Sequence, residues 1–255
     1  MFAEKRKENI LKLLKNKQTV KVSELSRKFD VSQATIRRDL SELEEEGKIL
    51  RTHGGAMYRS YNRGLELSVE EKADKYFEEK SVIGKKAAEF IQNGDTIMID
   101  TGTTTARLVS HLKEKEDLTI ITNGLNIINK IYESKLKAKV VMVGGNLRPK
   151  TGAMVGPLAE DSLEKIRVDK VFLGTNGLNI VDGATTPDIS EARIKEKMIE
   201  ISKEVYILCD HTKLDKVTFS KFADIDDIDY LIVDRLINLN KKQLNEFDVS
   251  LIVAE

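Results

Sequence analysis

The feature that most constrains the fold is a strand–turn–helix pattern that repeats from residue 96 to residue 253. Short apolar runs rich in β-branched residues alternate with amphipathic helical stretches. This alternation is typical of a mostly parallel sheet covered by helices, so it predicts an α/β domain. The expected strands are Thr96–Asp100, Thr119–Asn123, Lys139–Val143, Lys170–Gly174, Glu204–Asp210, Tyr230–Asp234 and Ser250–Val253. The expected helices between them are Ala106–Leu112, Leu125–Ser134, Pro157–Ile166 and Ile189–Ser202.

Charge is unevenly distributed, although the chain of 255 residues balances 42 Lys and Arg against 42 Asp and Glu. Residues 1–60 hold 14 basic and 9 acidic side chains, and the other 195 residues hold 28 and 33. A small basic head on a larger acidic body indicates two domains, with the head facing a polyanion. An excess of five charges is also common on a solvated surface, so the charge balance alone does not show that the head binds a polyanion.

The first 58 residues have the pattern of a winged helix-turn-helix domain. Ser23 and Ser32 are the expected N-caps of the second and third helices, Ala34 is expected on the inner face of the third, and Gly47 suits the position that ends it. The expected helices are 4–15, 23–29 and 32–46, and the expected wing is a hairpin of 48–52 and 57–59 around a turn at 53–56.

The third helix and the wing carry side chains suited to DNA. Proteins of this kind place the N-terminal half of the recognition helix in the major groove, where Arg reads guanine and Gln reads adenine. Basic wing residues suit phosphate or the minor groove. The candidate DNA-binding residues are Ser32, Gln33, Thr35, Arg37, Arg38, Lys48, Arg51 and His53. A simple surface charge paired with the run Glu44–Glu46 explains one arginine alone, but not the ordered set of cap, turn, helix and wing.

We expect three parts: a winged helix-turn-helix domain over 1–58, a polar linker over 59–78, and an α/β sensor domain over 79–255. No stretch approaches the roughly 20 apolar residues of a membrane-spanning helix, and the N-terminus has no apolar signal core. The single cysteine, Cys209, lies in an apolar strand and is expected to be inert. It fits a reducing, cytoplasmic location, and with three His residues it leaves little room for a soft-metal site.

Polar side chains follow the ends of the predicted strands, where open α/β sheets bind ligands. After the first strand, the turn 101–105 offers hydroxyls and amides as an anion cradle, and it lacks the lysine of a Walker motif. Each turn taken alone is ordinary turn chemistry, whereas the set suits a polyol and its phosphate. The candidate effector-binding residues are Asp100, Thr101, Gly102, Thr103, Thr104, Thr105, Asn123, Gly124, Gly144, Gly145, Lys150, Asn176, Gly177, Thr185, Thr186, Asp210 and Lys213.

With these motifs, the whole chain resembles the DeoR family of bacterial transcriptional regulators. The matching segments are Val22–Leu25, Val31–Leu40 and Arg51–Ala56 in the head, and Asp100–Thr105, Thr122–Gly124, Val143–Gly145 and Asp210–Lys213 in the body. The resemblance implies a sensor domain similar in fold to ribose-5-phosphate isomerase, a phosphate held by Thr101–Thr105, and Lys213 near the sugar. Gly174–Gly177, Thr185–Asp188 and Val217–Phe219 look most like the fructose-operon repressors, whose effector class is fructose 1-phosphate.

We therefore expect a DNA-binding regulator, a repressor of a sugar uptake or catabolism operon, controlled by a phosphorylated sugar. Its expected partners are double-stranded operator DNA, the effector and further copies of itself in a homodimer or homotetramer, with no cofactor, metal or membrane.

The alternatives are a sugar-phosphate isomerase-like enzyme with a fused regulatory head and a nucleotide-binding switch. The isomerases carry an Asp-Gly-Ala-Asp-Glu run where this chain reads Gly174–Gly177, so the base needed for isomerisation is not expected, although Asp100 and Glu191 remain. The switch lacks the glycine fingerprint of dinucleotide sites and the Walker lysine.

Overall fold

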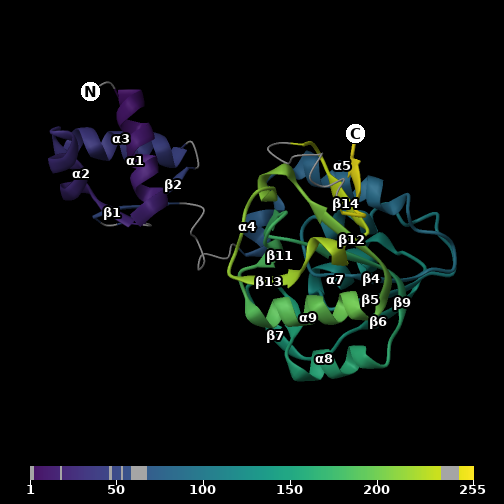
Figure 1. Ribbon diagram of the computed structural model, residues 1–255. Helices are drawn as coiled ribbons and strands as arrows, with labels where there is room; N and C mark the ends of the chain where they lie inside the picture. The colour runs from purple at the N-terminus through teal and green to yellow at the C-terminus, as the bar shows by residue number, and fades with distance from the viewer. Residues whose placement is uncertain (1–2, 18, 46–47, 53, 59–67, 237–246) are drawn as a thin grey trace. The chain divides into compact units, whose positions relative to one another are not determined.

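The computed structural model describes residues 3–17, 19–45, 48–52, 54–58, 68–236 and 247–255. The chain divides into two compact units, Met1–Gly64 and Leu65–Glu255, which are taken separately below (Figure 1). Of the segment predicted as a linker, residues 59–67 lie outside the described residues, and the short helix α4 (Val69–Ala73) lies within the remainder.

The first unit is a winged helix-turn-helix, as the sequence predicts. Its elements are α1 (Ala3–Lys17), β1 (Thr19–Lys21), α2 (Val22–Phe29), α3 (Gln33–Glu45), β2 (Ile49–Thr52) and β3 (Gly55–Tyr58). The strands form an antiparallel sheet in the order β1-β3-β2. The apolar stripes of the helices meet in one core, in which Ile10, Leu25, Ile36 and Leu40 are fully buried. Gly55 is required in the wing, because a Cβ there would lie 1.9 Å from the carbonyl oxygen of Val20.

Local details of the helix ends differ from the sequence prediction. Helix α2 begins at Val22, with Lys21 as its N-cap, so the prediction that Ser23 caps it is wrong. The first residue of the helix is bound to the wing, because the amide of Val22 donates to the carbonyl oxygen of Gly54 at 2.9 Å. The predicted cap of α3 is confirmed, since Ser32 Oγ accepts the amide of Thr35 at 3.1 Å. Ala34 is exposed rather than inward, and Gly47 lies outside the described residues.

A buried ion pair fixes α1 against α3. The guanidinium of Arg6 donates to both oxygens of Asp39, with Nε–Oδ2 at 2.5 Å and Nη2–Oδ1 at 3.0 Å. Only 7% of the Arg6 side chain and 4% of the Asp39 side chain are exposed. Two parallel hydrogen bonds hold one mutual orientation of the two side chains, so this pair helps to fix the orientation of α3 relative to α1.

The second unit is built on a seven-stranded parallel sheet in the order β15-β14-β12-β9-β4-β5-β6. Its strands are β4 (Thr96–Ile99), β5 (Thr119–Thr122), β6 (Lys139–Met142), β9 (Val168–Gly174), β12 (Ser202–Cys209), β14 (Tyr230–Val233) and β15 (Ser250–Val253). All seven predicted strands are thereby confirmed. The chain runs outward from β4 to β6 and then crosses to β9 on the other side of β4. The strand order therefore reverses between β4 and β9, which is where such sheets bind ligands.

Helices cover both faces of this sheet. One face packs under α5 (Phe77–Ala88), α6 (Thr105–Val109) and α7 (Leu125–Ser134), and the other packs under α8 (Pro157–Glu164) and α9 (Ile189–Glu200). Figure 1 shows α8 and α9 side by side on one face. Successive strand residues point to opposite faces, so Ile97 and Ile99 join the first core while Met98 joins the second.

Five further strands were not expected from the sequence. They form a hairpin of β7 (Asn146–Arg148) and β8 (Ala153–Val155) and an antiparallel sheet of β10 (Gly177–Asn179), β11 (Gly183–Thr186) and β13 (Ser220–Ala223). Each is only three or four residues long, too short to show the alternation that marks a strand, and all but β8 contain glycine or polar residues. In the described parts of the chain, no helix has the length and apolar character needed to cross a membrane.

The buried pair in the first unit gives a stability prediction. Asp39→Ala removes the carboxylate that accepts two hydrogen bonds from a buried guanidinium, so it should destabilise the first unit by about 3–5 kcal/mol. Urea denaturation of the full chain, followed by amide NMR signals of α3, measures the change. Glu42→Ala is the control, because Glu42 is partly exposed and Lys7 keeps Glu4 as a partner. An equal shift of both variants would contradict the prediction.

Candidate functional site

A polar cavity lies at the carboxyl ends of β4, β9 and β12, at the reversal of strand order. Side chains from these strand ends, from α4, α5 and α9, and from the β7–β8 hairpin converge on it. Its lining residues are Val69, Lys72, Lys80, Thr101, Gly102, Thr103, Thr104, Thr151, Gly174, Thr175, Asn176, Glu191, Lys195, Asp210 and Lys213. The lining thus combines four ammonium groups with hydroxyls, an amide and two carboxylates, which suits a polar, anionic ligand.

The threonine loop after β4 is held from behind. Asn123 Oδ1 accepts both the amide and the hydroxyl of Thr101, at 3.0 and 3.1 Å. The hydroxyl of Thr105 donates to the carbonyl oxygen of Asp100 at 2.7 Å, and the Asn126 amide donates to that of Gly102 at 2.9 Å. Because these groups are used inside the fold, they position the loop, and the residues between 101 and 104 face the cavity.

A buried ion pair lies beneath the cavity floor. The ammonium of Lys195, from α9, contacts Asp100 Oδ2 and donates to the carbonyl oxygen of Gly174 at 2.9 Å. The Gly174 amide donates to Asp100 Oδ2 at 3.2 Å. Burial raises the pKa of the Asp100 carboxyl, and the Lys195 ammonium opposes this shift. The pair therefore joins the ends of β4 and β9 to α9 at one point.

Glu191 forms the acceptor side of the cavity. Its Oε1 atom accepts the hydroxyl of Thr151 at 2.7 Å and contacts the guanidinium of Arg148. Its Oε2 atom accepts the hydroxyl of Thr186 at 3.2 Å. The same guanidinium binds Asp188 at 3.2 Å. These contacts fix a carboxylate at the cavity wall, where it can accept a hydrogen bond from a ligand hydroxyl.

Lys80 is a buried cation that sequence reasoning missed. Only 4% of the residue is exposed, and its Nζ donates to the carbonyl oxygen of Lys72 at 2.5 Å. Burial lowers the pKa of Lys80 to about 8; Asp210 opposes this shift, while the cations Lys213, Arg107 and Lys72 reinforce it. A cation held among cations in a low-dielectric site is stabilised when an anion enters.

Asp210 and Lys213 follow β12 at the edge of the same cavity. Asp210 Oδ1 accepts the amide of Thr212 at 3.0 Å. Its Oδ2 atom is buried and receives no hydrogen bond from the described residues, and the Lys213 ammonium lies 4.0 Å away. An open acceptor beside a partly exposed ammonium leaves this corner able to bind a ligand that carries both donors and negative charge.

The structure brings together part of the predicted effector set. Thr101, Gly102, Thr103, Thr104, Asn176, Asp210 and Lys213 line the cavity. Asp100, Thr105 and Asn123 lie directly beneath it, with the contacts given above. Thr186 contacts Glu191, whereas Thr185 donates to the carbonyl oxygen of Gly177 at 3.1 Å. Gly177 itself packs closely, since a Cβ there would lie 2.5 Å from the carbonyl oxygen of Lys216.

The remaining predicted residues do not line the cavity. They are Gly124, Gly144, Gly145 and Lys150. Gly124 is the N-cap of α7, and Gly145 packs against Ala159 with a positive φ of 136°. Gly144 and Lys150 are exposed. Gly144 and Gly145 follow β6, an edge strand two positions from β4, whereas the hairpin beyond them brings Thr151, but not Lys150, to the cavity.

Helix periodicity could have revealed the missed lysines. Lys80 shares an inward stripe of α5 with Ile83, Gly84 and Ala87 at spacings of three, four and seven. Glu191 and Lys195 occupy the corresponding stripe of α9. A charged residue at a core-facing position of a helix needs a partner or a ligand, and this is the signal that the sequence offered.

In the first unit, the exposed face of α3 and the wing form a second polar surface. A shallow hollow is lined by Val22, Ser23, Gln33, Arg37, Arg51, Gly54 and Gly55. Arg37 Nη2 lies 3.5 Å from Gln33 Oε1, and Arg51 Nη1 donates to Ser41 Oγ at 2.9 Å. These contacts hold the two guanidinium groups on the outer side of the recognition helix, where they can meet base edges and phosphates.

The other candidate DNA-binding residues have varied environments. Arg38 is exposed and pairs with Glu42 at 3.4 Å. The hydroxyls of Ser32 and Thr35 lie 3.0 Å apart at the start of α3, so both take part in the helix cap. Lys48 is exposed, and His53 lies outside the described residues.

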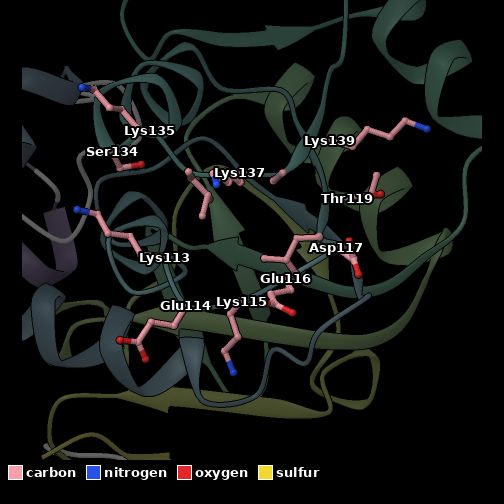
Figure 2. Close-up of a pocket in the computed structure, with 13 residues that line it drawn as sticks. Lys113, Glu114, Lys115, Glu116, Asp117, Thr119, Ser134, Lys135, Lys137 and Lys139 are labelled. Carbon is pink, nitrogen blue, oxygen red and sulfur yellow. The ribbon is translucent and has the colours of Figure 1, made fainter.

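A larger hollow lies at the opposite edge of the sheet, where β5 and β6 begin. Its lining residues are Lys113, Glu114, Lys115, Glu116, Asp117, Leu118, Thr119, Ser134, Lys135, Leu136, Lys137, Ala138 and Lys139. Figure 2 shows the side chains of Lys113 and Lys135 reaching toward one side and that of Lys139 toward the other. Since its charged groups do not converge, this hollow is a gap between two loops rather than a ligand site.

One described cluster has the composition of a metal site. Glu79, His211 and Asp234 bring ligand atoms within 4.8 Å of one another. His211 Nδ1 already contacts Asp234 Oδ2 at 2.7 Å, and Arg235 Nη2 lies 2.9 Å from His211 Nε2. A guanidinium in contact with the imidazole repels a metal cation, so the cluster is better described as a hydrogen-bonded ion-pair network.

Some solved structures match about half of this chain or slightly more. Ribose 5-phosphate isomerase A from Neisseria gonorrhoeae matches with a TM-score of 0.40 and 15% identity, covering 54% of this chain and 53% of the isomerase. The eIF2B beta subunit from Chaetomium thermophilum matches with a TM-score of 0.41 and 16% identity, covering 61% and 48%. At this level of likeness we draw no conclusion about chemistry.

Family models and curated relatives cover far more of the sequence. Residues 6–61 match the DeoR-like helix-turn-helix domain, and residues 75–235 match the DeoR C terminal sensor domain. The HTH-type transcriptional regulator FruR of Bacillus subtilis is 37% identical, covering 92% of both chains. The lactose phosphotransferase system repressor of Staphylococcus epidermidis is 36% identical, covering 97% of this chain and 98% of the relative. The chain therefore belongs to the DeoR family of transcriptional regulators.

Proposed function

We propose that the protein is a repressor of a sugar uptake or catabolism operon, and that a phosphorylated sugar binds in the cavity at the carboxyl edge of the sheet. The observation that carries this proposal is the lining of the cavity. Lys72, Lys80 and Lys213 supply positive charge, while threonine hydroxyls, Asn176 and Glu191 supply donors and acceptors. Cations suit a phosphate, and fixed hydroxyls, amides and carboxylates suit a polyol.

In this proposal the phosphate meets the loop 101–104 and Lys80. The loop is held by Asn123. The buried ammonium of Lys80 donates to a neutral carbonyl, and it has further N–H donors for a phosphate oxygen. The sugar hydroxyls then lie toward Glu191 and Asn176. Fructose 1-phosphate is the favoured effector, because the segments noted above look most like the fructose-operon repressors. Relatives named FruR and lactose phosphotransferase system repressor support a sugar-linked role.

We propose binding without turnover. Moving a proton between C1 and C2 of a sugar needs a positioned base. The oxygens of Glu191 are engaged by Thr151, Thr186 and Arg148, and Asp100 is paired with Lys195 beneath the floor. Relatives are named as regulators and repressors, which agrees with a binding role.

Control of transcription follows from two linked equilibria. A homodimer or homotetramer presents two heads to an operator, with half-sites spaced by about one DNA turn, roughly 10 bp, or a multiple of it. The effector changes operator affinity only if it binds one state of the protein more tightly than the other. We propose that the phosphosugar favours the state with the weaker operator affinity.

Arg37→Ala should weaken operator binding by about 1–3 kcal/mol and relax specificity at one base position, because an exposed arginine on the recognition helix can read guanine with two hydrogen bonds. Fluorescence anisotropy with single-base operator variants at fixed salt measures both effects. Arg38→Ala is the matched control, expected to weaken binding to all sequences equally and to reduce the salt slope by about one. Unchanged affinity and specificity for Arg37→Ala would show that this face of α3 does not read the bases.

Combined Thr103→Ala and Thr104→Ala substitutions should abolish the response to the sugar phosphate and leave operator affinity unchanged. Both residues line the cavity, and the first unit has its own core. Calorimetry with fructose 1-phosphate and anisotropy with operator DNA test the two halves separately. Thr119→Ala, at the opposite edge of the sheet, serves as the control. A double variant that still responds would remove the phosphate assignment from this loop.

Affinity for the sugar phosphate should fall about tenfold between pH 7 and pH 9. The pKa of Lys80 is about 8 in the empty cavity, so the ammonium that binds the anion is lost over this interval. The phosphate itself is already fully ionised there, since its second pKa is about 6. Lys80→Gln should bind more weakly at pH 7 and show no such decline. The same decline in both proteins would exclude Lys80 as the titrating group.

A further inference from the structure

Helix α4 is both a wall of the cavity and the first described element after the DNA-binding unit. Val69 and Lys72 line the cavity. In sequence, α4 is separated from the end of the wing strand β3 at Tyr58 by residues 59–68 alone. Helix α4 is therefore the cavity element next in sequence to the segment that leads to the first unit.

Hydrogen bonds to backbone carbonyls link the described part of α4 to the rest of the unit. The Val69 amide donates to the carbonyl oxygen of Lys150 at 3.2 Å, and Arg107 Nη2 donates to that of Ala73 at 3.4 Å. Val69, Lys72 and Ala73 are only half-buried, and Glu71 is exposed. A five-residue helix with so little apolar burial lies at the low-stability end of a fold, because packing rather than propensity sustains short helices.

The capping box is the main internal support of α4. The Ser68 amide donates to Glu71 Oε2 at 2.7 Å, and the Glu71 amide donates to Ser68 Oγ at 3.2 Å. Neither side chain lines the cavity. The support of the helix can therefore be removed without altering the surface that a ligand would touch.

The contact that links α4 to the cavity is made by Lys80. Its ammonium donates to the carbonyl oxygen of Lys72 at 2.5 Å, and it also lines the cavity. A phosphate oxygen is a stronger partner for an ammonium than a neutral carbonyl is, because hydrogen bonds between ionised groups are roughly twice as strong. The ammonium has three N–H donors and can reach both partners, but an anion that draws it toward the cavity would lengthen and weaken its hydrogen bond to the Lys72 carbonyl.

A hinge separates α4 from the rigid part of the unit. Tyr76, between α4 and α5, has a positive φ of 55°, a conformation that a tyrosine rarely adopts. Its ring meets that of His211 edge-on at 5.5 Å, and the Arg107 guanidinium lies 4.0 Å above the Phe77 ring. Beyond this point, α5 is anchored by core residues such as Ile83. The packing of this region on the core therefore begins at α5, after Tyr76.

We propose that α4 is the element that couples occupancy of the cavity to the DNA-binding unit. In the empty protein, Lys80 holds α4 through the Lys72 carbonyl. When a sugar phosphate binds, Lys80 turns to the anion, and α4 leaves its seat, which changes the segment that leads to the heads. This inference rests on the proposed function, since it requires an anion in the cavity.

The test compares Glu71→Ala with the native full-length protein. Loss of the carboxylate breaks the capping box and unseats α4 whether or not the ligand is present. Binding of fructose 1-phosphate, measured by calorimetry, should stay within about threefold of native or become tighter. The ratio of operator affinities with and without the ligand, typically about 5–150 for coupled sites, should fall below about three.

Asp227→Ala is the matched control. Asp227 Oδ2 accepts the amide of Asp224 at 2.8 Å at the start of the 3₁₀ helix η3 (Ile225–Asp227), in the same way that Glu71 accepts that of Ser68, but away from the cavity. This variant should keep the native ratio. A native ratio in Glu71→Ala would overturn the coupling role of α4.

Hydrogen exchange in the native protein gives a second readout that needs no variant. The amides of Val69 and Lys72 are bonded in the seated helix, so fructose 1-phosphate, or inorganic phosphate as a simpler probe, should raise their exchange rates about tenfold or more. Ligand binding without any change at these amides would overturn the inference. If calorimetry shows no binding of either probe, both the proposed function and the coupling role of α4 are wrong. If a probe binds without changing these exchange rates, only the coupling role is wrong.

Discussion

The buried contact between Asp100 and Lys195 is the interaction on which the sensor site depends. It joins the ends of the two central strands, β4 and β9, to helix α9, with Gly174 bonded to both partners. Both charges are almost wholly removed from water. Breaking such a pair leaves an uncompensated buried charge, so each partner holds the other in place. The floor of the cavity is therefore rigid, and the loop 101–104 and Glu191 take their positions from it.

Rigidity of the floor contrasts with the opposite wall. Lys80 and the carbonyl of Lys72 are held by a single hydrogen bond, and the short helix α4 has no fully buried side chain among those described. A site with one fixed side and one weakly held side can bind a ligand and also respond to it. Burial lowers the pKa of Lys80, and the neighbouring cations Lys213, Arg107 and Lys72 reinforce this shift. A phosphate beside Lys80 would oppose the shift by stabilising the charged ammonium.

Much of the fold could be predicted from the sequence, because the strands of a parallel sheet are buried on both faces and appear as apolar runs. All seven strands of the sheet and the winged helix-turn-helix are confirmed. The short strands of the β7–β8 hairpin and the second sheet could not be seen, since their pairing comes from tertiary contacts rather than from apolar alternation. For the cavity, the strand-end rule identified Thr103, Asp210 and Lys213, but it also drew in Gly144 and Lys150, because strand order is not visible in the sequence. Lys80 and Lys195 lie on helices, and the strand-end rule covers only residues that follow strands.

The most direct test of this account is a fluorescence-anisotropy titration of the full-length protein onto DNA from its own upstream region, at one salt concentration. Fructose 1-phosphate, free fructose and other phosphorylated sugars would be compared at equal concentration, because phosphate contacts make DNA affinity steeply dependent on salt. The account predicts tight, sequence-specific binding that a phosphosugar weakens and its free sugar leaves unchanged. Specific binding that no phosphosugar alters would contradict the proposed effector site. The absence of specific binding would contradict the proposal that this DNA contains the operator.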